Sequence, residues 1–413
     1  ISDGIPKSES SFVHVVKEDP KRGGMLYAGI DKGIYISHND GKTWARLRNN
    51  LPPAPVYWME VQERFDDLVV GTYGRGYYIL DDLGAIRNAD KLGSEPQVFE
   101  MRDTYRFNSR ESIKTDGPSN NSGQNPPNGA IINYYLPQKH NGKLLLEIQS
   151  MDGDVIRTME PSKDAGVNRT VWNLRYESTY RPQLRTQPPG RPWVQLNGEG
   201  WRPLTTWDLD LNAGQLGPRV VPGKYKAVLK IMDSNDKVQK EVTQEFNVLK
   251  DPFSEGTIAD IQAQVDFSLQ LRDAMNIAVS SINAVEVLRI ELKAIIAEES
   301  DKKIQKEAIR LKAIAEDIAS KLYDIHLTGA REDAFRSPMK LYGRLSALAS
   351  DINGSGIDFR PTDQQGEVSE ILNERLQNAV KQFEQIKEND IEKFNKALEK
   401  KNRTLTIEKT GGR

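Results

Sequence analysis

The sequence predicts a multidomain β + α protein, with β structure up to about residue 250 and helices after it. Short β-prone runs, separated by Gly, Asn, Asp and Pro turns, recur through the first part. From Thr257 onward, apolar residues recur at helical spacing instead. The length of 413 residues also exceeds what one hydrophobic core usually serves.

Composition argues against several classes of function. The 57 Lys and Arg residues against 59 Asp and Glu give a net charge of -2, and a nucleic-acid partner would require clustered basic charge. No apolar run is long enough to cross a bilayer, so we expect no membrane span. The absence of Cys excludes disulfides and thiolate metal sites. Ile1 is no initiator residue, and we favour numbering that begins inside a longer protein.

Residues 1–108 are predicted to hold two successive groups of short strands, because turn residues such as Asn39-Asp40-Gly41 separate the β-prone runs. Residues 97–101 are a possible closing strand of the second group. The other predicted strands are 12–16, 25–28, 33–37, 43–47, 56–61, 68–72 and 76–80.

One octet in this region has a distinctive spacing of polar, Gly and Trp positions. Its matching residues are Ser37, Asn39, Gly41, Thr43 and Trp44, and they resemble the Asp-box of sialidase and sortilin-like β-propellers. Such a motif acts as a hairpin staple: small polar side chains bond the backbone of the turn, Gly permits an unusual φ, and Trp packs between blades. We expect these five residues to be structural.

Further segments are similar to the last blades of bacterial BNR-repeat, sortilin-like propeller proteins, which are often labelled glycosyl hydrolases. They are 12–16 with 18–20, 26–29, 50–52, 67–72 and 79–82. The resemblance implies that residues 1–108 are terminal propeller blades. Because a ring needs about four to eight blades, it also implies upstream blades in the same protein or on another chain. It implies an extracytoplasmic bacterial location: periplasm, cell surface or secreted.

Residues 109–127 are polar and form a predicted linker. Over residues 128–252, six or seven alternating strands favour an immunoglobulin-like sandwich with Trp172 in its core. Residues 177–219 interrupt this domain as a long insertion without periodicity, rich in Trp, Arg and Pro.

The insertion is the predicted binding element, because Trp and Arg dominate binding hot spots. Its candidate residues are Trp193, Trp201, Trp207, Arg191 and Arg202. Two interpretations stay open: the tryptophans fasten the insertion to its own sandwich or to the propeller, or they contact an external protein or glycan. Under the second, at least one of them makes inter-domain or inter-chain contacts rather than lying in the sandwich core.

Residues 253–405 are predicted to form an antiparallel bundle of four amphipathic helices, with a tail over 406–413. Thr257 with Asp260, and Thr362 with Gln365, have the spacing of capping boxes. Ser337-Pro338 is expected to open the third helix. The apolar stripes are expected to form a shared core.

Common catalytic, metal-binding and cofactor-binding motifs are absent from the sequence. The sequence holds no metalloprotease His-Glu-x-x-His, no phosphate-binding loop and no Gly-x-Ser-x-Gly elbow. We expect no catalytic residue, no metal site and no cofactor. The Gly-rich run Gly71–Gly76 joins two predicted strands and is interpreted as a hairpin.

The sequence therefore predicts a non-catalytic, extracytoplasmic binding and scaffolding segment of a propeller protein, which recognises a protein or a glycan. The alternative is part of a sialidase-like glycoside hydrolase whose active site lies mainly in upstream blades. In that case Tyr73, Arg75 and Tyr77 could line the centre of the ring. We do not expect catalysis by this chain alone, and catalysis by the complete protein stays open.

Overall fold

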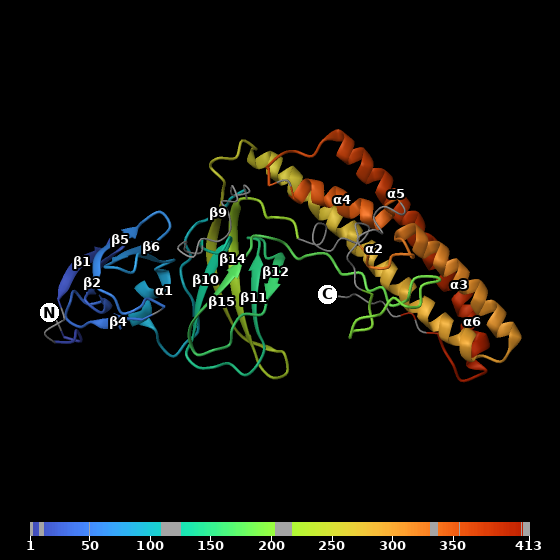
Figure 1. The fold of residues 1–413 in the computed structure, drawn as a ribbon, viewed down its shortest axis with the longest axis horizontal. Coiled ribbons are helices and arrows are strands. Elements are labelled where there is room, and N and C mark those ends of the chain that lie inside the picture. Colours follow the sequence, from blue (N-terminus) through green and yellow to red (C-terminus); the bar gives the residue numbers. More distant parts are fainter. Residues whose placement is uncertain are drawn as a thin grey trace. The chain divides into compact units, whose positions relative to one another are not determined.

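The computed structural model describes residues 3–7, 12–48, 50–108, 125–202, 217–330, 338–354, 356–405 and 407. The chain divides into two compact units (Figure 1). The first comprises Ile1–Leu174 with Pro222–Pro252, and the second Arg175–Val221 with Phe253–Arg413. Sheets fill the first unit and helices dominate the second, so the predicted mixed β and α class is confirmed.

Two antiparallel sheets open the first unit, each with its strands in chain order. The four-stranded sheet consists of β1 (Val13–Asp19), β2 (Arg22–Ile30), β3 (Gly33–Ser37) and β4 (Ala45–Leu47). The three-stranded sheet consists of β5 (Val56–Gln62), β6 (Asp67–Thr72) and β7 (Tyr77–Leu80). Alternate side chains of both sheets meet in one apolar core that includes Met25, Tyr27, Met59 and Leu68.

Two further sheets complete this unit. Their strand orders are β12-β11-β14-β15-β9 and β13-β10-β8. The strands are β8 (Gln97–Val98), β9 (Thr104–Arg106), β10 (Ala130–Leu136), β11 (Leu144–Gln149), β12 (Val155–Met159), β13 (Gly166–Trp172), β14 (Gly223–Met232) and β15 (Val238–Lys250). Trp172 is fully buried, with its ring centroid 5.7 Å from that of Tyr225 and 6.0 Å from that of Phe246. This tryptophan therefore joins both sheets in an aromatic core.

The strand expected over residues 97–101 does not close the preceding sheet. Gln97–Val98 pairs with β10, and Thr104–Arg106 pairs with β15. After β7, a short helix, α1 (Gly84–Arg87), and a 3-10 turn, η1 (Ala89–Lys91), carry the chain to the second pair of sheets. Strands of the second β region thus begin well before the expected boundary at residue 108.

The helices of the second unit are α2 (Ile258–Glu298), α3 (Lys302–Leu322), α4 (Leu341–Gly354), α5 (Asp363–Ile386) and α6 (Glu392–Glu399). A π-helical turn, η4 (Lys387–Ile391), interrupts the expected fourth helix between α5 and α6. Both predicted capping boxes, at Thr257 and Thr362, are present. The expected start of the third helix is wrong, because α4 begins three residues after Pro338. Ser337 lies outside the described residues.

The central turns of α2 are covered on every side. Six consecutive residues, Ser281–Glu286, are each at most 8% exposed. Six residues of a helix at 3.6 residues per turn point in all directions, so this helix needs partners around its whole circumference. α3, α4 and α5 contact α2, and the insertion, which belongs to the same unit, supplies further contacts.

Candidate binding site

The two ends of the insertion lie side by side. Arg175 and Arg219 form an isolated β-bridge, and Arg175 Nη1 donates to the Gly217 carbonyl at 2.9 Å. The sequence left open whether the insertion fastens to its sandwich or to the propeller. Its described residues, 175–202 and 217–221, belong instead to the helical unit.

Three polar side chains on α2 hold the backbone of the insertion. The hydrogen bonds join Tyr180 N to Asn276 Oδ1 (2.8 Å), Gln183 N to Asn283 Oδ1 (2.7 Å) and Thr186 N to Glu286 Oε2 (2.8 Å). Because this segment pairs with no strand, its backbone donors would otherwise lack protein partners. Between these bonds, Leu184 is fully buried in the apolar core of the helices.

Glu286 is a fully buried carboxylate at the centre of this attachment. It accepts hydrogen bonds from Arg289 Nη1 at 2.5 Å, from Thr186 Oγ1 at 3.0 Å and from the Tyr323 hydroxyl. Burial, reinforced by the negative charge of Glu286, raises the pKa of Tyr323 well above its ordinary value, which keeps the phenol a neutral donor. One cation and several donors thus compensate the buried charge.

Arg202, a candidate binding residue, lies inside the helical unit and is 3% exposed. Its Nη1 donates to the Leu327 carbonyl at 2.6 Å, and its backbone N donates to the Leu184 carbonyl at 2.8 Å. Burial lowers the pKa of Arg202. These contacts fasten the insertion to the helices, so Arg202 is placed to hold the insertion rather than to meet an external ligand.

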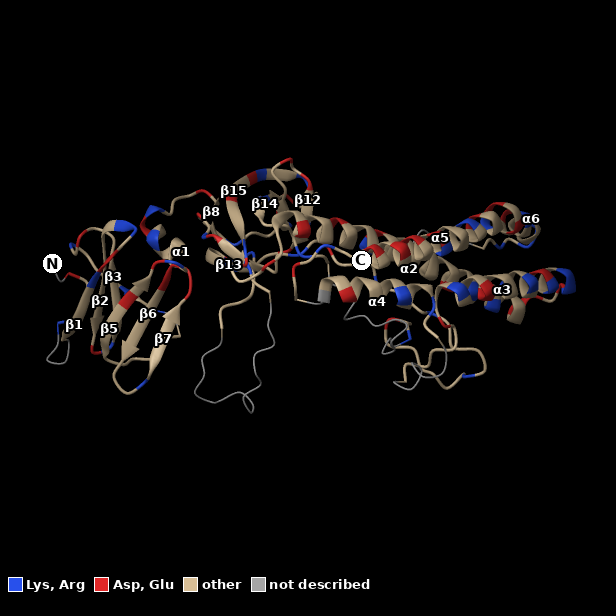
Figure 2. Cartoon of the chain, turned by 90° about the horizontal axis from the view of Figure 1, so that it is seen from above, with Lys and Arg blue, Asp and Glu red and all other residues tan. Residues whose placement is uncertain are grey.

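Arg191 lies at a cavity of about 340 Å³ beside the Pro-rich turn of the insertion. Residues 186–192 form one wall, and α2 and α3 supply Arg289, Lys293, Lys312 and Glu316. Figure 2 shows Lys and Arg recurring along α3. The sequence predicted Arg191, but not the helical residues that share its cavity.

The structure separates the tryptophans of the insertion. The Trp193 side chain is 69% exposed. Trp201 is partly buried, with the Arg185 guanidinium 5.8 Å from its ring centroid. Neither lies in the core of the β region, and Trp207 is outside the described residues.

The five residues that resemble an Asp-box form a hairpin turn closed by contacts among themselves. Ser37 Oγ accepts from Gly41 N at 2.9 Å, and Asn39 Oδ1 accepts from Thr43 N at 2.9 Å. The Trp44 indole N–H donates to the Gly41 carbonyl at 3.1 Å, and Gly41 has a φ of 76°. Trp44 is partly buried against the small cluster of Ala28, Ile30 and Tyr35.

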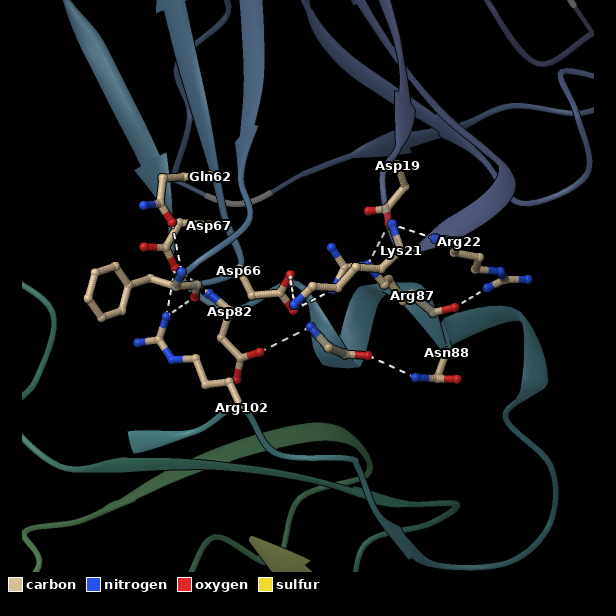
Figure 3. A network of polar contacts seen from close by, with 12 residues as sticks. Asp19, Lys21, Arg22, Gln62, Asp66, Asp67, Asp82, Arg87, Asn88 and Arg102 are labelled. Carbon is tan, nitrogen blue, oxygen red and sulfur yellow. Dashed lines mark hydrogen bonds and ion pairs between the residues drawn. The ribbon is translucent and has the colours of Figure 1, made fainter. Parts of the chain in front are cut away.

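A buried polar network ties together elements of the first unit (Figure 3). Arg87 Nε donates to Asp19 at 2.8 Å, and its Nη1 donates to Asp66. Burial opposes the charge of Asp19, yet hydrogen bonds from Arg87, Tyr27 and the Lys21 backbone outweigh it and lower the pKa of this carboxyl. A general acid needs a raised pKa, whereas this carboxylate stays ionised and hydrogen-bonded. Its role in the first unit is therefore structural.

The residues of the enzyme alternative lie on the β6–β7 hairpin. The hairpin interpretation of Gly71–Gly76 is confirmed, since Gly71 pairs with Tyr77. The Tyr73 and Tyr77 side chains are 71% and 84% exposed, and Arg75 is exposed as well. Tyr73 lies 5.5 Å from Tyr57 between ring centroids. These rings form an open aromatic surface.

Among the residues that the structure describes, no group of three or more His, Cys, Asp or Glu side chains could hold a metal ion. Nor does a described helix combine the length and apolar character that crossing a membrane requires.

Comparisons with known proteins identify no family. No protein-family profile matches the chain, and no curated protein matches it. Similar solved structures include the extracellular domain of a hybrid two-component system from B. thetaiotaomicron, at 10% identity and a TM-score of 0.17, covering 58% of this chain and 25% of that one. Another is the extracellular domain of a one-component system from the same organism, at 10% identity and a TM-score of 0.16, covering 59% and 26%. The chain thus spans about a quarter of their length, and such TM-scores carry no argument about function.

Proposed function

We propose that this chain is a non-catalytic, extracytoplasmic segment that binds a protein or a glycan and braces a β-propeller. The observation that carries the binding role is the construction of the insertion. Its backbone is fastened to α2 and Arg202 is buried, while Trp193 remains 69% exposed. A loop that is already ordered before binding loses little conformational entropy when it binds. An exposed tryptophan offers a large flat contact area.

The propeller part of the proposal rests on the sequence resemblance and is supported by the first two sheets. They run in chain order and share one core, and the Asp-box residues staple a hairpin. The three-stranded sheet leaves large apolar side chains exposed, among them Trp58 (60%), Tyr77 (84%) and Ile79 (62%). Such a surface suits coverage by a further blade.

A direct test compares the whole chain with the variant Trp193→Ala on arrays of oligosaccharides and extracellular proteins. We expect selective binding that falls at least about ten-fold in the variant, as for a hot-spot tryptophan. Phe12→Ala is the matched control, because Phe12 is 65% exposed but lies in the first unit and outside the three-stranded sheet. It should leave binding unchanged.

Three results would contradict the proposal. They are equal loss of binding in both variants, the absence of any ligand whose binding depends on Trp193, and hydrolysis of a bound glycan by the chain itself. Melting curves of the two variants should coincide with that of the unsubstituted chain, so that loss of binding is not loss of folding.

A further inference from the structure

The cavity beside the insertion is lined mainly by positive charge. Four cationic side chains border it, and one carboxylate. The cations are Arg191, Arg289, Lys293 and Lys312, and the carboxylate is Glu316. Because all five belong to the second unit, the cavity is a feature of that unit alone. A cleft lined by one sign of charge concentrates counter-ions of the other sign.

Only part of this charge is compensated. Glu316 Oε1 lies 2.8 Å from Lys312 Nζ and 3.6 Å from Arg289 Nη2, so it is shared between two cations. Glu286 pairs with Arg289 from the buried side. Neither Arg191 nor Lys293 forms an ion pair with any described residue, although both border the cavity.

Arg289 gives the cavity a fixed, buried cation. Its side chain is 3% exposed and held by Glu286 and Tyr323, the latter at 2.9 Å from Nη1. Arg289 Nε has no hydrogen-bond acceptor within the described part of the chain. Buried donors are nearly always paired in proteins, so an unpaired one beside a cavity points to an acceptor from outside the chain.

We propose that this cavity binds an oxyanion, namely the carboxylate or phosphate group of a ligand. Arg191 and Lys293 supply the contacts from opposite walls, and Arg289 supplies positive charge at the base. The planar guanidinium presents paired N–H donors that match two oxygens of a carboxylate or a phosphate and bind them with charge-assisted hydrogen bonds. A volume of about 340 Å³ is at the small end for ligand sites and suits one sugar-sized group.

The inference deepens the proposed function and rests on it for the identity of any larger ligand. Arg191 and Trp193 are two residues apart in one turn, in which Arg191 N donates to the Pro188 carbonyl at 3.1 Å and Val194 N to the Arg191 carbonyl at 3.3 Å. An acidic group held at Arg191 would therefore place the rest of its molecule close to Trp193.

The test is isothermal titration calorimetry of the whole chain at low ionic strength with inorganic phosphate, galacturonate and galactose. Galacturonate and galactose differ only at the carboxylate carbon, so their comparison isolates the charge. We expect one or both anions to bind and galactose not to bind. Binding of phosphate alone or of galacturonate alone identifies the source of the oxyanion, and added salt should weaken either.

Paired variants locate the site. Arg191→Gln with Lys293→Gln should weaken anion binding at least about ten-fold, because both cations that lack partners are removed. Lys303→Gln with Lys306→Gln, on the exposed face of α3, removes the same charge away from the cavity and should have little effect. Helical circular dichroism confirms that both variants fold.

Equal binding of galactose and galacturonate, equal effects of the two double variants, or no binding of either anion would overturn the inference. The proposed function fails separately. A neutral ligand whose binding requires Trp193 but not Lys293 would contradict the oxyanion site and support the proposed binding role. Phosphate binding that requires Lys293, without any ligand whose binding requires Trp193, would support the oxyanion site and contradict the proposed binding role.

Discussion

The Ser37–Trp44 hairpin and the described part of the insertion, residues 177–202 and 217–219, both carry tryptophan on irregular backbone, yet they are held in different ways. In the hairpin, the contacts among the Ser37, Asn39, Thr43 and Trp44 side chains and the Gly41 backbone join residues at most four positions apart, although Asp40 N and Trp44 N also donate to the Gly24 and Asp3 carbonyls. In the insertion, side chains 96 to 100 positions away bind the backbone amides. The side-chain contacts that close the hairpin turn are local, whereas those that hold the insertion need folded helices. The insertion should therefore lose its order whenever α2 does.

The largest effect is expected from Glu286→Ala, which removes the nearer carboxylate of the buried Arg289 and leaves only Glu316, at 3.6 Å. Removing one partner of a buried ion pair costs about 3–5 kcal/mol of unfolding free energy. Urea denaturation followed by helical circular dichroism measures the loss. Glu291→Ala on the same helix, where the side chain is partly exposed, should change stability by less than about 0.5 kcal/mol. Equal costs for the two variants would refute the role of the buried carboxylate.

A smaller effect is expected from Asn283→Ala, which leaves the Gln183 amide without its acceptor. An unsatisfied buried donor costs about 1–3 kcal/mol. Hydrogen exchange resolved by peptide should show faster exchange over residues 180–186, with the Ser37–Trp44 hairpin unchanged. Unaltered exchange over 180–186 would show that the insertion does not depend on α2.

Gly41→Ala probes the locally held hairpin. Gly41 has a φ of 76°, and a left-handed backbone costs an alanine roughly 1–2 kcal/mol. The loss should appear in hydrogen exchange of β3 and β4, and not over residues 180–186. Asn tolerates this conformation better, so Gly41→Asn should be less destabilising. The idea fails if both substitutions cost the same.

The smallest effect on stability is expected from Trp193→Ala. The side chain is 69% exposed, and substitutions at such positions usually change the unfolding free energy by less than about 0.5 kcal/mol. Thermal denaturation measures it. A cost above about 1 kcal/mol would mean that Trp193 is a packing residue, which would weaken its assignment to ligand contact.

The same contrast explains how much of the fold could be predicted. Turns such as Asn39-Asp40-Gly41 and capping boxes such as that of Thr257 are determined by neighbouring residues, and the strands and helices they bound were found within a few positions. The strand at Gln97 was assigned to the wrong sheet, because its partner Tyr135 is remote in sequence and no local pattern specifies it.

The sequence predicted residues of the insertion that belong to the candidate site, but not the residues of α2 that hold the insertion in place. The richness of the insertion in Arg and Trp indicated Arg191 and Trp193, whereas Asn283, Glu286 and Arg289 were missed. These three are polar residues at buried positions of α2, where the surrounding residues Ile282, Ala284, Val285 and Leu288 are apolar, which is the signal that could have found them. Which face of α2 the insertion covers depends on contacts about 100 residues apart, and periodicity carries no such information.

The division of the chain between its two units limits how they can be separated. The chain passes from one unit to the other three times, at residues 174–175, 221–222 and 252–253. No single proteolytic cut releases either unit. A truncation after Pro252 would remove α2 and leave the backbone amides of Tyr180, Gln183 and Thr186 without their hydrogen-bond acceptors. A recombination event that transferred the helices alone would likewise leave Asn276, Asn283 and Glu286 without the amides that they bind.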